Sequence, residues 1–296
     1  MKNVFLVILA GVCWGVVSIF VTKLQAAGFS SMQCVALRMF FAMLVLLVYL
    51  LITDRSKLKI HIADLPYFIV MGFVSMAFTN LCYFKCLEAI GSSSIPTLLL
   101  YTAPIFVVII SAVIYKEKIT RQKFFALILT FLGLVTVTGV LGGGDKIPVY
   151  AFIFGIGAAL GHSSYSIVGK FVTGKYAAVT VTFYMFLWAS VIAVPVSGIT
   201  ANLSLLLDAK IILVVVCMVL ISTVTPYFAY LAGLSGMEAG KAAVLSYAEP
   251  ATAALAGVLY FKEVLTANKA IGMLLILAAI VCLNVKLPAR KARQTC

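Results

Sequence analysis

The chain has 296 residues, of which 64% are hydrophobic and only 10% are charged, and its mean hydropathy is +1.18. Soluble domains carry roughly 25% charged residues, so this chain cannot cover a water-facing surface and is expected to be an integral membrane protein. Its formal net charge is +13. Because the cations lie between apolar runs, we expect anionic lipid headgroups as their partner and no nucleic acid.

Ten apolar runs are long enough to cross a bilayer, which requires about 20 residues per helix. The sequence lacks the alternating pattern of a β-barrel, so each span is predicted to be a helix and the fold class all-α. The connections are too short to hold a soluble domain. The predicted spans are 3–24, 31–53, 65–85, 93–115, 121–141, 149–170, 179–200, 209–232, 240–261 and 268–287.

One segment of the fourth predicted span recurs in the ninth at an offset of 146 residues, and the same offset aligns Gly11 with Gly157 and Gly15 with Gly161. We therefore predict two five-helix repeats, 1–146 and 147–296, the second ending in a short basic tail. The glycine-rich tract Gly142–Gly144 would join them. The paired motifs are Tyr101-x-x-Pro104 with Tyr247-x-Glu249-Pro250, and Lys116-Glu117-x-x-Thr120 with Lys262-Glu263-x-x-Thr266.

The loop cations predict the orientation, because cytoplasmic loops carry an excess of lysine and arginine. One end of the predicted bundle holds both termini and most of these cations, so both termini are expected in the cytoplasm. Since each repeat has an odd number of spans, the second must enter from the opposite side, and the repeats are predicted to be inverted. The cations at that end are Lys2, Arg55, Lys57, Lys59, Lys116, Lys118, Arg121, Lys123, Lys170, Lys175, Lys241, Lys286, Arg290, Lys291 and Arg293.

The paired motifs, with Trp14 in span one and Arg38 in span two, resemble the EamA family of the drug/metabolite transporter superfamily. The resemblance covers nearly the whole chain and implies ten spans in two inverted five-helix repeats. It also implies a substrate cavity between the halves, lined by spans one, three, four, six, eight and nine. Members that are similar in fold transport amino acids, nucleotide-linked compounds, vitamins or toxic cations, so the resemblance does not identify a substrate. Span one lacks the acidic residue that couples protons in the small four-span multidrug relatives.

Two ionisable residues lie near the middle of their predicted spans. At about 1.5 Å per residue, His162 in span six and Glu249 in span nine come to similar depths. An ionised side chain there costs at least ~2.5–3.5 kcal/mol, so such residues usually face a cavity or each other. We predict that Glu249 is the main electrostatic determinant of a substrate site, with a neutral, hydrogen-bonded packing role as the alternative. Two histidines without a nearby cluster predict no metal site.

Aromatic residues on the spans expected to line the cavity complete the predicted site, although packing explains most aromatics in membranes. The set suits an aromatic or cationic metabolite. Proline bends or breaks a helix, so Pro104 and Pro250 are predicted to act as static kinks or as hinges beside the cavity. The predicted substrate-binding residues are Trp14, Tyr83, Tyr101, His162, Tyr165, Tyr227, Tyr247 and Glu249.

Three further features have structural explanations. Glu117 and Glu263 end helices beside a lysine, so capping or loop pairing is expected rather than catalysis. The Gly-x-x-x-Gly pairs of spans one and six favour close helix packing. Arg38 lies about 11 Å from the predicted span end, within reach of snorkelling, which favours anchoring over substrate contact.

The expected function is secondary transport, with export favoured, of a small metabolite by alternating access around a midplane cavity. The chain has no Walker A motif, so direct use of ATP is not expected. An intramembrane enzyme and a passive channel are the alternatives; the first would need paired catalytic groups within the spans. The expected partners are a small-molecule substrate and the lipid bilayer, with a homodimer left open and no cofactor. The protein is expected to be a multi-pass protein of the bacterial cytoplasmic (inner) membrane.

Overall fold

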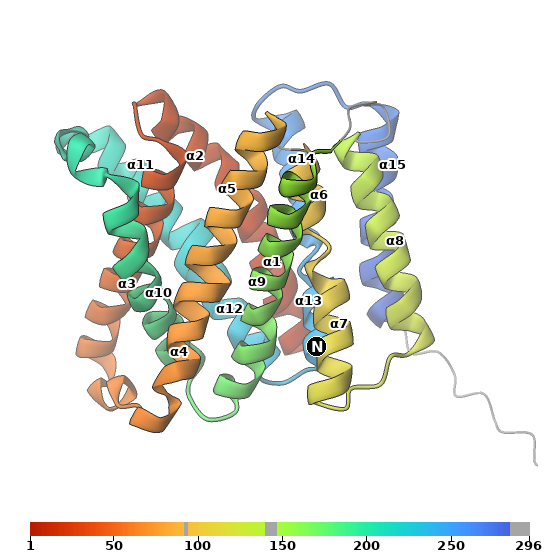
Figure 1. Cartoon of the computed structure of the whole chain (residues 1–296), viewed down its shortest axis with the longest axis horizontal. Coiled ribbons are helices and arrows are strands. Elements are labelled where there is room, and N and C mark those ends of the chain that lie inside the picture. Colours follow the sequence, from red (N-terminus) through yellow and green to blue (C-terminus); the bar gives the residue numbers. More distant parts are fainter. Residues whose placement is uncertain (92–93, 140–146, 285–296) are drawn as a thin grey trace, which may run out of the picture.

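The computed structural model describes residues 1–91, 94–139 and 147–284, and all regular elements within these ranges are helical (Figure 1). Ten helical stretches in this part of the chain are long and apolar enough to cross a membrane. The predicted all-α class and the number of spans are therefore confirmed. The Gly142–Gly144 join and the basic residues Lys286, Arg290, Lys291 and Arg293 lie outside the described residues.

Several spans consist of two or three helical pieces in direct succession. The first half contains α1 (Lys2–Gly15) with α2 (Val17–Ala26), α3 (Ser31–Thr53), α4 (Leu65–Gly72) with η3 (Phe73–Phe78) and α5 (Thr79–Ile90), α6 (Ser94–Leu100) with α7 (Ala103–Ile114), and α8 (Arg121–Thr138). The second half contains α9 (Val149–Thr173), α10 (Ala178–Ser197), α11 (Ala209–Val219) with η6 (Leu220–Val224) and α12 (Thr225–Leu234), α13 (Ala239–Leu245) with α14 (Ala248–Leu259), and α15 (Ala267–Asn284). Short 3₁₀ turns lie at Arg55–Leu58, Ile62–Asp64 and Ile199–Leu207.

The helix interruptions recur at the repeat offset. The π-helical segments η3 and η6 occupy matching places in spans three and eight, and spans four and nine are both broken just before Pro104 and Pro250. Each proline lies in the first turn of the helix after its break, where the missing N–H removes no helical hydrogen bond. Span one is also broken, at Val16, whereas the matching α9 is continuous.

Close packing of α1 explains the spacing of its glycines. A methyl group at Gly11 would lie 2.6 Å from the carbonyl oxygen of Ser246, and one at Gly15 would lie 2.6 Å from Cβ of Thr252. Both neighbours belong to span nine, so α1 crosses α14 at nearly backbone contact, as small residues permit in membranes. The crossing places span one directly beside Glu249, whose backbone oxygen would lie 2.7 Å from the same methyl group at Gly15.

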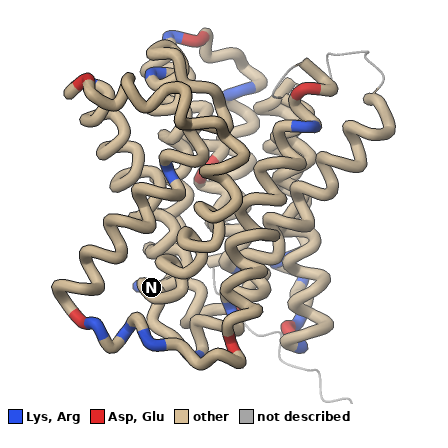
Figure 2. The backbone as a smooth tube through the Cα atoms, turned by 60° about the vertical axis from the view of Figure 1, so that its left-hand side comes forward, with Lys and Arg blue, Asp and Glu red and all other residues tan. Residues whose placement is uncertain are grey.

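The two halves enter the bundle from opposite ends. α1 begins at the end that holds the N terminus, here called the N-terminal end, and α9 begins at the opposite end (Figure 1). α8 and α15 pack against each other along one side (Figure 1). Lysines, arginines and carboxylates gather at the two ends and are sparse in between (Figure 2). Superposition of the two repeats after inversion stays a prediction.

Candidate functional site

A polar cavity of about 510 Å³ lies in the half of the bundle away from the N-terminal end. Its walls come from α2, the beginning of α3, α5 and α6, which meet at that end (Figure 1), and Glu249 of α14 contributes from the second half. The cavity therefore has one wall from spans one to four and one contact with span nine. Spans six and eight, which the family resemblance placed in the lining, supply none of its wall.

Two ionisable residues of opposite charge type line this cavity, Arg38 and Glu249. Glu249 lies in the first turn of α14, half-buried, and the hydroxyl of Tyr101 contacts its carboxyl group. Arg38 lies in the third turn of α3, where its Nε donates a hydrogen bond of 3.3 Å to Oγ1 of Thr223. It also contacts the hydroxyl of Tyr227. The sequence favoured anchoring for Arg38, whereas the structure places it in the cavity lining.

Tyrosines and small polar side chains form the rest of the polar wall. Tyr83 and Tyr101 both line the cavity, and the hydroxyl of Tyr83 lies 3.1 Å from Oγ1 of Thr97 on α6. Tyr83, Tyr101 and Glu249 are thus the predicted substrate-binding residues that the structure brings together here. Thr97 and Asn80 join them, although nothing in the sequence distinguished these two residues. Neutral polar residues in long apolar spans are common, so their sequence gives no distinguishing signal.

A packed aromatic cluster lies next to Arg38, outside the cavity lining. The ring of Trp14 lies 5.0 Å from that of Tyr227 and 6.4 Å from that of Tyr165, measured between centroids. Tyr165 stacks on Tyr230 at 5.1 Å, and its hydroxyl donates to the carbonyl oxygen of Tyr227. The indole N–H of Trp14 is buried without a hydrogen-bond partner among the described residues. The cluster fills the space between spans one, six and eight, which explains why spans six and eight do not reach the cavity.

Tyr247 and His162 also lie outside the cavity lining. Tyr247 is buried, and its hydroxyl donates to the carbonyl oxygen of Tyr101 while the two rings lie 5.7 Å apart. His162 is half-buried on α9. Within the described residues, no hydrogen bond or ion pair joins His162 to Glu249.

The N-terminal end of the bundle is closed by polar contacts between the halves. The hydroxyl of Tyr115 donates to the carbonyl oxygen of Ile167 at 2.6 Å, which ties α7 to α9. Between α4 and α9, Lys175 Nζ bonds Asp64 Oδ1 at 2.7 Å. This hydrogen bond raises the pKa of Lys175. The hydroxyl of Tyr176 donates to the other oxygen of Asp64 at 2.8 Å.

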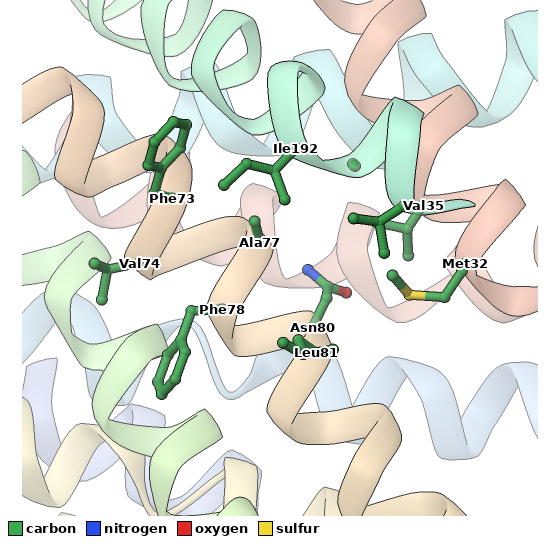
Figure 3. A pocket seen from close by; sticks show the side chains of 11 residues that line it. Met32, Val35, Phe73, Val74, Ala77, Phe78, Asn80, Leu81 and Ile192 are labelled. Atoms are coloured by element: carbon green, nitrogen blue, oxygen red, sulfur yellow. The ribbon is translucent and has the colours of Figure 1, made fainter. Parts of the chain in front are cut away.

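A second, apolar groove of about 330 Å³ runs along the outside of α3, η3, α5 and α10 (Figure 3). Its lining is aliphatic and aromatic apart from Asn80, whose amide donates to the carbonyl oxygen of Met76 one turn earlier. Val35 and Asn80 line both this groove and the polar cavity, so a thin wall separates them. A surface of this composition matches lipid chains better than a polar ligand.

No group of three or more His, Cys, Asp or Glu side chains within the described residues could hold a metal ion. Ten apolar spans, with a polar cavity between helices at one end of the bundle, make this a multi-pass membrane protein with a candidate substrate site. The EamA-like transporter family model matches residues 1–139 and again residues 149–285. The chain therefore belongs to the EamA-like transporter family, within the drug/metabolite transporter superfamily, and is a transporter rather than an enzyme.

Known relatives agree with this assignment. The chain is 28% identical over 284 residues to an uncharacterized transporter of Archaeoglobus fulgidus, covering 95% of this chain and 98% of the relative. It is 25% identical over 258 residues to the uncharacterized transporter YdfC of Bacillus subtilis, covering 83% and 79% of the two chains. A crystal structure that is 18% identical superposes with a TM-score of 0.78 and covers 95% of this chain and 96% of that one, which shows the shared fold.

Proposed function

We propose that this protein is a secondary transporter that exports a small metabolite by alternating access around the polar cavity. One observation carries the proposal. A cavity that contains both Arg38 and Glu249 lies toward one end of the bundle, and polar contacts between the halves close the other end. Ionisable groups inside a membrane protein normally mark a substrate or ion pathway. A conformation closed at one end is one of the two states that alternating access requires.

The cavity chemistry favours a substrate that carries an amino group. The carboxyl group of Glu249 could bind an ammonium group, and the rings of Tyr83 and Tyr101 could stack on an aromatic or cationic portion. Arg38 offers a second anchor suited to a carboxylate. A volume of about 510 Å³ is in the range of small-molecule sites. These features support an amino acid or a related aromatic or cationic compound.

We place the protein in the bacterial cytoplasmic membrane with both termini in the cytoplasm, which the cation-rich N-terminal end supports. The cavity would then open outward, as in the state that releases an exported compound.

Counterflow in proteoliposomes tests the proposal. Vesicles preloaded with an unlabelled amino acid or organic cation should take up the same labelled compound transiently above equilibrium, because a carrier exchanges substrate across the membrane. Glu249→Gln should reduce the initial rate for an amino-bearing substrate at least about tenfold, since one charge-assisted contact is worth roughly 1.5–3 kcal/mol. Lys85→Gln, which alters an exposed cation outside the cavity lining, is the control.

The outcomes separate the alternatives. Uptake that never exceeds equilibrium and does not saturate would contradict a carrier and favour a passive channel. Counterflow that survives unchanged in Glu249→Gln at every pH between about 5.5 and 8.5 would leave Glu249 as a packing residue and remove the proposed site.

A further inference from the structure

The repeated Lys-Glu-x-x-Thr motif builds the same turn in both halves. Its lysines, Lys116 and Lys262, are the described non-glycine residues with positive φ, at 53° and 59°. The backbone N–H of Glu117 donates to Ser111, and that of Glu263 donates to Gly257, at the matching position. In each half the motif's threonine then caps the next helix, α8 or α15, by accepting from a backbone N–H three residues later.

The two glutamates nevertheless have different surroundings. Glu117 is nearly fully buried, with 7% of its side chain exposed. Its Oε1 accepts from the backbone N–H of Ala239 at 2.7 Å and its Oε2 from that of Gly240 at 3.2 Å, so its carboxylate joins the end of α7 to the beginning of α13. Ser111 Oγ donates to Oε2 at 3.1 Å and Lys123 Nζ lies 3.5 Å away. Glu117 therefore fastens the first half to the second at the N-terminal end.

Glu263 makes no such bond between the halves within the described residues. Its side chain is 50% exposed and pairs with Lys269 at 2.6 Å, the lysine that matches Lys123. The helices next to the two glutamates also differ in how closely they pack. α7 packs closely against α13, whereas the matching pair, α14 and α6, makes little contact in the described part of the chain. Glu263 lies at the same end of the bundle as the cavity, whose walls include α2, α5 and α6.

We propose that Glu117 and Glu263 are alternating latches of the transport cycle. Glu117 holds the N-terminal end closed in the present conformation. When that end opens, its carboxylate leaves the N–H groups of Ala239 and Gly240, and Glu263 bonds the backbone N–H of Ser94 at the opposite end. The residue that matches Gly240 is Ser94, the first residue of α6, so the first turn of α6 is the docking position for Glu263. This inference rests on alternating access, as proposed above.

Chemistry favours this use of a carboxylate. A bond between an ionised group and backbone N–H donors is strong when water is excluded, yet both partners are well solvated when exposed. The same residue can therefore be buried and bonded in one state and hydrated beside its lysine in the other. The present structure shows both conditions at once: Glu117 of the first half is buried and bonded, and Glu263 of the second half is exposed beside its lysine.

Reporter cysteines at matched positions would measure the balance between the two states without any substrate. Ser18→Cys lies in the cavity lining, and Ser164→Cys is its counterpart on α9. In a background without reactive native cysteines, each is treated with a membrane-impermeant thiol reagent from each side. We expect Glu117→Gln to raise the labelling rate of Ser164→Cys from the N-terminal side, and to lower that of Ser18→Cys from the other side. The ratio of the two rates should change about tenfold, for a loss of about 1.4 kcal/mol.

Glu263→Gln is expected to change the same ratio in the opposite direction, because it weakens the other latch. Glu88→Gln is the matched control, since it removes the charge of an exposed glutamate paired only with Lys85 in the described residues. Its ratio should equal that of the parent. If Glu117→Gln and Glu263→Gln shift the ratio in the same direction, or if a folded Glu117→Gln leaves it unchanged, the latch proposal is wrong.

A second variant covers the case in which Glu117→Gln does not fold. Ala239→Pro removes the donor of the 2.7 Å bond while keeping every charge, and proline is accepted at the first position of a helix. The preceding residue, Glu238, already has the extended backbone that proline requires, with φ −66° and ψ 140°. It should shift the ratio as Glu117→Gln does; an unchanged ratio contradicts the latch. Because labelling measures conformation alone, a failure here is distinct from a failure to observe counterflow.

Discussion

At the scale of single residues, the crossing of α1 and α14 depends on glycines that have no room for a side chain. Gly11 and its repeat counterpart Gly157 offer a matched comparison. A methyl group would lie 2.6 Å from a backbone oxygen at Gly11, but 3.3 Å from the sulfur of Cys82 at Gly157. The backbone contact cannot move aside without separating the helices, whereas a sulfur atom at the end of a side chain can shift by a few tenths of an ångström.

We therefore expect Gly11→Ala to destabilise the protein by about 1–3 kcal/mol through overpacking. Gly157→Ala should change stability by less than about 1 kcal/mol, because the gain in helix propensity offsets a small side-chain shift. Thermal unfolding in detergent measures both. Equal midpoints for the two variants would show that the α1–α14 contact is looser than the structure indicates.

The residue scale also shows what the sequence could and could not predict about the site. Depth along a span follows from counting residues, and this located Glu249 well inside the membrane. Rotation of a helix about its axis and the lateral distance between spans do not follow from counting. As a result, the sequence could not separate Tyr83 and Tyr101, which line the cavity, from Trp14 and Tyr165, which pack beside it. For the same reason it treated Arg38 as a snorkelling anchor.

At the scale of elements, spans four and nine are broken at matching places, and the breaks touch each other. A break leaves backbone carbonyl groups without helical partners, which is costly away from water. Here the hydroxyl of Tyr247 in one break donates to the carbonyl oxygen of Tyr101 in the other. The sequence predicted a kink or a hinge from Pro104 and Pro250; it could not predict that the breaks pair, since pairing depends on the packing of the two halves.

We expect Tyr247→Phe to lower stability by about 1–3 kcal/mol, because it leaves the buried carbonyl oxygen of Tyr101 without its partner. Tyr101→Phe is the matched control: it removes a hydroxyl that faces Glu249 and leaves the Tyr247 bond to the backbone intact. Its melting temperature in detergent should stay close to that of the parent. If Tyr247→Phe were no less stable than Tyr101→Phe, the two breaks would not depend on this bond.

At the scale of the whole molecule, the two ends of the bundle differ in how many bonds can close them. At the N-terminal end, Tyr115 bonds the carbonyl oxygen of Ile167, and Lys175 bonds the carboxylate of Asp64. The residues that match Tyr115 and Lys175 are Phe261 and Phe29, which cannot make these bonds. Of these closing contacts, the glutamate latch alone has the same residue type in both halves. The conformation closed at the N-terminal end is therefore the one that the side chains favour without substrate.

The positive-inside rule predicts which side of the membrane the closed end faces: the cation-rich N-terminal end is expected in the cytoplasm. Ser56, between α3 and α4, lies exposed at that end, and Thr200, which follows α10, lies exposed at the opposite end. In a background without reactive native cysteines, Thr200→Cys should react with an impermeant maleimide on intact cells. Ser56→Cys should react appreciably only after the cells are permeabilised, at a rate at least about tenfold above that on intact cells. The reverse pattern would place both the termini and the closed end outside, and the open cavity would then face the cytoplasm as a site of substrate entry.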